Sequence, residues 1–393
     1  MKSSCSAASA RSKAQFVPSL DDIVGIAESL QVQPLLVDRE RCIAVRHRQA
    51  TCRRCAAACP MDAISVAPRE ITLHPSLCVA CGACVVACPT EALIIPRAVE
   101  EDMLDALTMQ ASECAVATIA CARACSKKRI DPARVAEVPC LARVDECMLV
   151  QSAAAGAHTV RLVDGDCATC KYGICMDNVV ATIDSAVDLI EAQGAHLEIE
   201  YASELPADCL AVEDEALSAS RRGFFSEAVS AARGASASVA RATIGRDQSD
   251  TTTYDSAVYG TRVSEENGMP TFNMPRREAL LNALFELGEP AQYNVESPTF
   301  AHVDIVADVC NGCGVCCVFC PTDALRRDTS HKPYINPRFL EFHASDCVNC
   351  GLCANVCWKK ACKLSDGAPL TQILDFEPVA FRLDSGKSTN PAV

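Results

Sequence analysis

The sequence has little of several features that identify common protein classes. Aromatic residues make up only 5% of its 393 residues. It contains no run of about 18 apolar residues, so we expect no transmembrane helix. Its N-terminal residues lack the apolar segment of an export signal, and we expect an intracellular, cytoplasmic protein. The formal charge of −14 argues against nucleic-acid binding, which favours basic surfaces.

Motifs of nucleotide and hydrolytic sites are also missing. We find no glycine-rich dinucleotide fingerprint, no P-loop, no H-E-x-x-H and no G-x-S-x-G. The chain is therefore expected to bind no nucleotide, flavin or molybdenum. Any catalytic centre of its reaction is expected to lie on a partner protein.

Cysteine, in contrast, is abundant: the chain has 28. Disulfide scaffolds are usually short secreted chains, so these cysteines are expected to be thiolate ligands in a reducing compartment. All but Cys5 and Cys209 fall into three groups, which span Cys42–Cys88, Cys114–Cys175 and Cys310–Cys362.

The first group contains the run C-V-A-C-G-A-C-V-V-A-C-P at residues 78–89. This is the C-x2-C-x2-C-x3-C-P spacing in which three thiolates bind one iron–sulfur cluster and the fourth binds its neighbour. A partner run over 52–60 lacks the expected cysteine at Gln49, and Cys42 is the natural substitute. Without Cys42, the site would hold a 3Fe–4S cluster or a cubane with an open iron. Cluster one would use Cys42, Cys52, Cys55 and Cys88. Cluster two would use Cys59, Cys78, Cys81 and Cys84.

The third group repeats this arrangement, with Trp358 where the second run would have proline. Cluster three would use Cys310, Cys313, Cys316 and Cys357. Cluster four would use Cys320, Cys347, Cys350 and Cys353. Two cysteines, Cys317 and Cys362, are left over and are interpreted as small buried residues.

Residues 42–95 and 303–365 resemble the two-cluster bacterial ferredoxin family. The resemblance implies two α+β ferredoxin-like units and four 4Fe–4S clusters. The alternative is zinc, which also uses paired C-x2-C ligands. Zinc sites do not use quartets of this form with a trailing proline, repeated along one chain, so we favour iron–sulfur clusters.

The middle group lies in a different pattern. Apolar runs at 115–120, 135–139, 158–163 and 197–202 alternate with helical stretches at 144–155 and 176–193, which predicts an α/β domain with a parallel sheet. Cysteines follow three of these strands, and carboxyl ends of parallel strands meet at one edge. We expect a metal or redox site there, built from Cys121, Cys125, Cys140, Cys167, and Cys170 or Cys175.

The segments IACARACS and VPCLARVDECMLVQSAAAGAHTVRLVDGDCATCKYG resemble the delta subunit of methyl-viologen-reducing hydrogenase. This resemblance covers about 113–203. It implies a 2Fe–2S cluster and redox partners: a hydrogenase, a formate dehydrogenase or a heterodisulfide-reductase-like flavoprotein. The cysteine pairs are spaced differently from the family's, so the ligand set stays open, and a zinc or cluster-free thiol site is the alternative. Cys114, Cys147 and Cys209 are expected to be core or strand residues.

The sequence therefore predicts a multidomain chain with a central α/β domain between two ferredoxin-type units. We expect an N-terminal extension (1–36), a ferredoxin unit (37–100), a delta-subunit-like domain (113–203), a helical linker (211–300), a second ferredoxin unit (301–365) and a tail (366–393). Within the linker we expect helices from about Ser218 to Ala232 and from Pro275 to a stop at Gly288.

A basic patch beside cluster one comprises Arg46, His47, Arg48, Arg53 and Arg54. It could attract an acidic redox partner, raise the cluster potential, or compensate the charge of the cluster. The favoured function is an electron-transfer subunit of an anaerobic redox complex. The alternatives are a redox-sensing or assembly protein and a thiol/disulfide reductase with an open cluster site.

Overall fold

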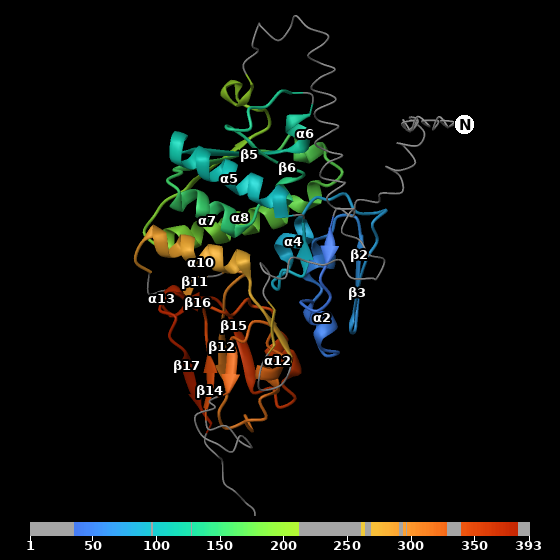
Figure 1. Cartoon of the computed structure of the whole chain (residues 1–393), viewed down its shortest axis with the longest axis vertical. Coiled ribbons are helices and arrows are strands. Elements are labelled where there is room, and N and C mark those ends of the chain that lie inside the picture. Colours follow the sequence, from blue (N-terminus) through green and yellow to red (C-terminus); the bar gives the residue numbers. More distant parts are fainter. Residues whose placement is uncertain are drawn as a thin grey trace, which may run out of the picture.

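The computed structural model describes residues 35–95, 97–126, 128–211, 261–263, 269–290, 294–295, 297–327 and 339–383. They form a unit towards each end of the chain and a sheet domain that lies against both (Figure 1). The helix expected from about Ser218 to Ala232 lies outside the described residues. In this described part, no helix has the length and apolar character needed to cross a membrane.

The central domain is built on a parallel sheet, as predicted. Its four strands are ordered β6-β5-β7-β8, and every neighbouring pair is parallel. The strands are β5 (Val116–Cys121), β6 (Ala136–Val138), β7 (Thr159–Val163) and β8 (Glu198–Ala202). Ile119 and Leu162 are fully buried in it, which explains the apolar runs in the sequence.

Helices α5 (Arg97–Cys114), α7 (Glu146–Ala154) and α8 (Met176–Ala192) pack beside this sheet (Figure 1). Gly156 and Gly194 follow α7 and α8 with φ of 103° and 75°, so they end these helices as predicted. Helix α5 was not identified from the sequence. The short helix α6 (Ala122–Cys125) follows β5.

Helix α10 (Pro275–Leu287) begins at the proline and ends before the glycine that the sequence indicated. It packs against α7, and its Leu280 and Leu284 are buried. Figure 1 shows α10 lying between the central domain and the C-terminal unit. Residues 275–287, which the sequence analysis assigned to a linker, therefore form a helix that packs between the central domain and the C-terminal unit.

The N-terminal unit is small and has little regular structure. Strand β1 (Leu36–Val37) pairs with β4 (Leu93–Ile94), and β2 (Ile64–Ala67) forms a hairpin with β3 (Glu70–Leu73). Its helices are the short α2 (Ile43–Arg46), α3 (Arg54–Ala58) and α4 (Ala83–Ala87).

The C-terminal unit has the same plan with more strands around it. Strand β12 (Ala301–Ile305) pairs with β15 (Cys362–Asp366), and α11 (Val315–Val318) and α12 (Leu352–Val356) carry cysteines. A second sheet has the order β13-β14-β17. The remaining elements are β9 (Thr261–Val263), β10 (Pro270–Phe272), β11 (Asn294–Val295), β13 (Leu325–Arg327), β14 (Phe339–Phe342), β16 (Ala368–Pro369), α13 (Leu370–Leu374) and β17 (Val379–Arg382).

This unit extends beyond the boundary expected at residue 365. Strand β17 pairs with β14, and Leu370 and Ile373 of α13 are buried. Residues 368–382 therefore belong to the packed unit and not to a tail, because their short apolar runs complete a sheet that the sequence alone does not show.

Candidate metal centres

Each ferredoxin-type unit gathers its cysteines into two sets. In the N-terminal unit, one small cavity is lined by the thiols of Cys42, Cys52, Cys55 and Cys88, here called site 1. A second cavity is lined by Cys59, Cys78, Cys81 and Cys84, here called site 2. These are the two quartets expected from the spacing, and Cys42 lies with site 1 despite its ten-residue separation from Cys52.

The C-terminal unit repeats this division. A cavity is lined by Cys310, Cys313, Cys316 and Cys357, here called site 3. The thiols of Cys320, Cys347, Cys350 and Cys353 interact electrostatically with one another and are called site 4. Burial raises the pKa of Cys347 to about 12, so this thiol needs a bound cation before it can become a thiolate at neutral pH.

A backbone turn repeats after each cysteine run and prepares the sulfur atoms for a cluster. The residue three positions after each fourth cysteine has positive φ: Asp62 (50°), Glu91 (50°), Asp323 (61°) and Lys360 (56°). In three of these turns the next backbone N–H donates to the cysteine Sγ at 3.3 Å, from Ala63 to Cys59, Ala92 to Cys88 and Ala361 to Cys357. Such donors stabilise a thiolate and raise the reduction potential of a cluster that it binds.

The arrangement of these thiols suits clusters better than single ions. In the described ranges, no group of three or more His, Cys, Asp or Glu side chains could hold one metal ion. A zinc ion needs its four ligands on one centre. An iron–sulfur cube instead binds each thiolate on a different iron, which spreads the ligands apart. The ligand chemistry of the quartets, thiolates at the C-x2-C-x2-C-x3-C spacing of which three sets each line a cavity, fits 4Fe–4S clusters.

The carboxyl edge of the central sheet brings together four of the six cysteines expected there. Cys121 ends β5, Cys140 follows β6, and Cys167 and Cys170 lie in the loop after β7. Cys167 interacts electrostatically with the other three. The carbonyl of Asp164 accepts hydrogen bonds from Cys121 Sγ (3.0 Å) and Cys167 Sγ (3.6 Å). We call these four cysteines the middle site.

The other two candidates lie at the margin of the middle site. Cys125 is next to Glu137 as well as Cys121, and burial raises its pKa to about 11. Cys175 is buried and hydrogen-bonded to Cys81 of site 2. Cys175 also interacts with Cys140, so it lies between site 2 and the middle site.

Four of the five remaining cysteines of the three groups and their surroundings are buried as expected, and one is not. Cys317 and Cys362 are buried as expected, but both contact other sulfur atoms: Cys317 Sγ is 4.0 Å from Cys316 Sγ, and Cys362 is hydrogen-bonded to Cys353. Cys147 and Cys209 are buried in the core. Cys114 is exposed at the end of α5, so the expectation of a core or strand residue is wrong for it.

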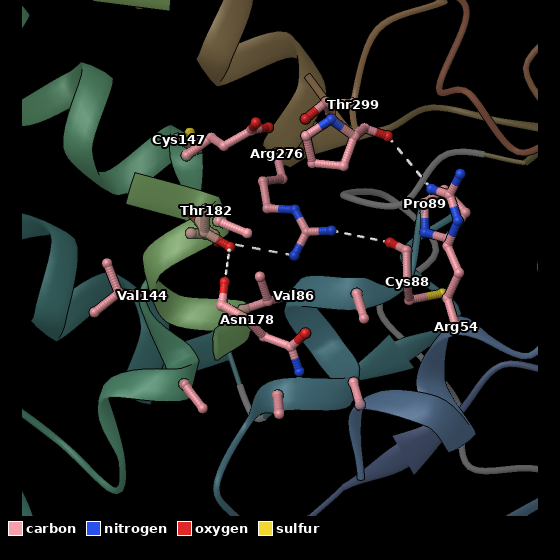
Figure 2. Close-up of a pocket in the computed structure, with 18 of the residues that line it drawn as sticks. Arg54, Val86, Cys88, Pro89, Val144, Cys147, Asn178, Thr182, Arg276 and Thr299 are labelled. Atoms are coloured by element: carbon pink, nitrogen blue, oxygen red, sulfur yellow. Dashed lines mark hydrogen bonds and ion pairs between the residues drawn. The ribbon is translucent and has the colours of Figure 1, made fainter. Parts of the chain in front are cut away.

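A cavity of about 450 Å³ lies where the N-terminal unit, the central domain and α10 meet (Figure 2). Arg276 of α10 points across it and donates to the carbonyls of Val85 and Cys88, both at 3.0 Å. Its neighbour Arg277 is buried and donates to the carbonyls of Ser345 and Ala344 in the C-terminal unit. The start of α10 therefore contacts both ferredoxin-type units, a role that the sequence did not reveal.

Two arginines of the expected basic patch face the C-terminal unit instead of solvent. Arg46 is buried and donates to the carbonyls of Phe319 (2.9 Å) and Cys320 (3.2 Å). Arg54 donates to the carbonyl of Asn349 at 2.8 Å. These two residues join the units and do not form a surface that attracts a partner.

Comparison with known proteins supports the ferredoxin-type units. A family model described as a 4Fe–4S dicluster domain matches residues 50–92 and 309–361. These two matches indicate an iron–sulfur electron-transfer role, and Cys42 lies before the first of them. The search of curated proteins and the search of solved structures found no match. The central domain lies outside the matched residues.

Proposed function

We propose that this chain relays single electrons through five sites in a fixed order: the middle site, site 2, site 1, site 4 and site 3. Four 4Fe–4S clusters in sites 1 to 4 and a 2Fe–2S cluster in the middle site would each supply a one-electron carrier. The residues of the chain hold neighbouring sites in contact and exclude water from them. No residue is assigned as an acid, a base or a nucleophile.

Contacts between ligands support the order within each ferredoxin-type unit. Cys84 of site 2 interacts electrostatically with Cys55 of site 1. In the C-terminal unit, Cys353 of site 4 interacts with Cys316 of site 3. Within each unit, the thiols of the two sites are therefore close enough to interact.

Contacts between the units are the strongest support for the relay. They connect the separate pairs of sites into one continuous path. Cys81 of site 2 interacts with Cys140 of the middle site. An apolar cluster around Ile43, Leu352 and Val356 includes both Cys52 of site 1 and Cys350 of site 4. This cluster joins the two ferredoxin-type units directly, with no intervening domain.

The two ends of this order are the places where redox partners would exchange electrons. Cys167 and Cys170 of the middle site are only partly buried, and Trp358, next to Cys357 of site 3, is 59% exposed. The resemblance of residues 113–203 to the hydrogenase delta subunit supports a hydrogenase, a formate dehydrogenase or a heterodisulfide-reductase-like flavoprotein as partners. Both ends would remain accessible while the inner sites stay covered.

The proposal is tested with the full chain purified without oxygen. We expect about sixteen irons in cubanes and about two more in the middle site. Electron paramagnetic resonance of the reduced chain should show magnetic coupling between neighbouring centres. A variant with both Cys347→Ala and Cys350→Ala, which leaves site 4 only two thiolates, should lose the site 4 cluster and its coupling to sites 1 and 3 and keep the coupling between sites 1 and 2.

Two results would contradict the relay. If the protein purified without oxygen contains no iron and is folded in all its units, the chain has no electron carriers and the relay is refuted. Thiol-dependent turnover of a disulfide by the isolated chain would instead favour the disulfide reductase. Cys147→Ala is the control, because Cys147 is a buried core cysteine outside all five sites.

A further inference from the structure

A single arginine lies at the contact between site 1 and site 4. Arg46 is the last residue of α2, which follows Cys42 of site 1 directly. Its side chain extends into the C-terminal unit, where Nε donates to the carbonyl of Phe319 and Nη2 to that of Cys320. Cys320 is a member of site 4, so one short helix serves both sites.

The guanidinium of Arg46 is buried and incompletely paired. The residue is only 8% exposed, and its Nη1 has no hydrogen-bond partner in the described part of the chain. Its charge lies 5.9 Å from the centre of the Phe272 ring and interacts with the thiols of Cys320 and Cys350, and none of these groups is a fixed anion. Burying a charged group without a counter-charge is costly, so this position needs an anion nearby.

Site 4 can supply that anion. A cluster ligated by four thiolates carries net negative charge, and each added electron increases it. A buried cation beside the site favours the reduced form, because the low-dielectric surroundings screen the attraction only weakly. Arg277 also lies near Cys347 of site 4, but all three of its donor nitrogens are bound to the carbonyls of Ser345, Thr299 and Ala344.

We propose that Arg46 of the N-terminal unit is a positioning residue for site 4, whose reduction potential it raises through its charge. The inference rests on the proposed relay and deepens it. Contact between the N-terminal and C-terminal units then has two effects. It connects site 1 to site 4, and it makes site 4 easier to reduce. Electron entry into the C-terminal unit thereby depends on contact between the units.

The test is a redox titration of the full chain, followed by electron paramagnetic resonance. The midpoint that changes in Cys347→Ser identifies site 4. In Arg46→Gln we expect this midpoint alone to become more negative, while Arg46→Lys, which keeps the charge, stays closer to the wild-type value. Arg54→Gln is the matched control, because Arg54 also joins the units but lies beside Cys52 of site 1.

Iron content and hydrogen exchange of each variant separate the possible results. If the chain binds no iron, the relay itself fails. If Arg46→Gln keeps all its iron and the site 4 midpoint does not move, only the role of Arg46 is refuted. An equal shift of the site 4 midpoint in Arg54→Gln would show that both arginines act only by packing the units together. Loss of the site 4 cluster in both Arg46→Lys and Arg46→Gln would show the same. Either result would refute the proposed role of the Arg46 charge. Loss of the site 4 cluster in Arg46→Gln, with the cluster kept in Arg46→Lys, supports a role for the positive charge of Arg46.

Discussion

The two ferredoxin-type units share one ligand spacing but differ in what supports it. The N-terminal unit has a small apolar core of its own, which includes Ile64, Ile71 and Leu93. The core of the C-terminal unit, with Phe300 and Phe342, is continuous with that of the central domain. The same cysteine pattern is thus supported by a small separate core in the N-terminal unit and by a large core, shared with the central domain, in the C-terminal unit.

Polar contacts supplement the small apolar core of the N-terminal unit. Arg41 is fully buried and donates to the carbonyls of Thr90 (3.1 Å) and Asn273 (2.6 Å). Arg276 reaches Cys88 from the central side, and Arg46 reaches Phe319. Small units with little apolar burial usually depend on bound metal for folding. The comparison indicates that the N-terminal unit needs its clusters for stability more than the C-terminal unit does.

The largest expected difference follows removal of iron. When the clusters are extracted without oxygen, amide protection in residues 35–95 should fall by several orders of magnitude, towards that of an unfolded chain. Strands β5, β7 and β14 should keep most of theirs, because their apolar core does not depend on metal. Hydrogen exchange measured by mass spectrometry gives this comparison directly. Equal loss in both units would remove the distinction between them.

Truncation of the shared core should have the next largest effect. Leu284 of α10 is fully buried, and Leu284→Ala should lower the free energy of unfolding by about 2–5 kcal/mol. Chemical denaturation should show this loss in the central domain and the C-terminal unit together. Ile71→Ala, in the core of the N-terminal unit, is the control and should destabilise that unit alone.

A smaller effect concerns one cluster. Cys42→Ala should remove one thiolate from site 1 and lower the iron content by about one atom per chain, with a 3Fe–4S signal in the oxidised protein. The control, Cys147→Ala, removes a buried core cysteine outside all five sites and should leave the iron content unchanged. Unchanged iron in Cys42→Ala would mean that another residue completes site 1.

The smallest effect is a pH dependence confined to the iron-free chain. Burial holds the pKa of Cys347 at about 12, above the value of about 8.5 for an unfolded chain. The folded state therefore favours the neutral thiol. This contribution to stability is fully present below pH 8.5 and is lost as the pH rises through 12. Denaturation of wild type and Cys347→Ser across this window measures it. Parallel pH profiles for the two chains would show that Cys347 contributes nothing.

Much of the candidate site could be predicted because its ligands are close in sequence. The spacing of Cys78, Cys81 and Cys84 holds them on one short loop, whatever the rest of the chain does. The turn after each run is equally local, since positive φ recurs at Asp62, Glu91, Asp323 and Lys360. The central strands and helix α10 were also indicated by local apolar patterns and by proline and glycine signals.

Other features could not be predicted, because they depend on packing between distant segments. Six cysteines were candidates for the middle site, but the way the loops pack places Cys175 against Cys81 of another unit. The burial of Arg46 and the contact of Arg54 with the C-terminal unit were likewise hidden, since an arginine-rich segment is usually solvated. Strand β17 joins the C-terminal sheet only because β14 offers it an edge.

The sequence by itself determined which cysteines form the ferredoxin quartets, because short-range spacing restricts where each thiol can lie. Only the tertiary structure decided which residues surround each quartet. Arg46 and Phe319, for example, are 273 residues apart in the chain and are hydrogen-bonded in the fold. Contacts over such separations depend on the burial of whole surfaces, which no local pattern encodes.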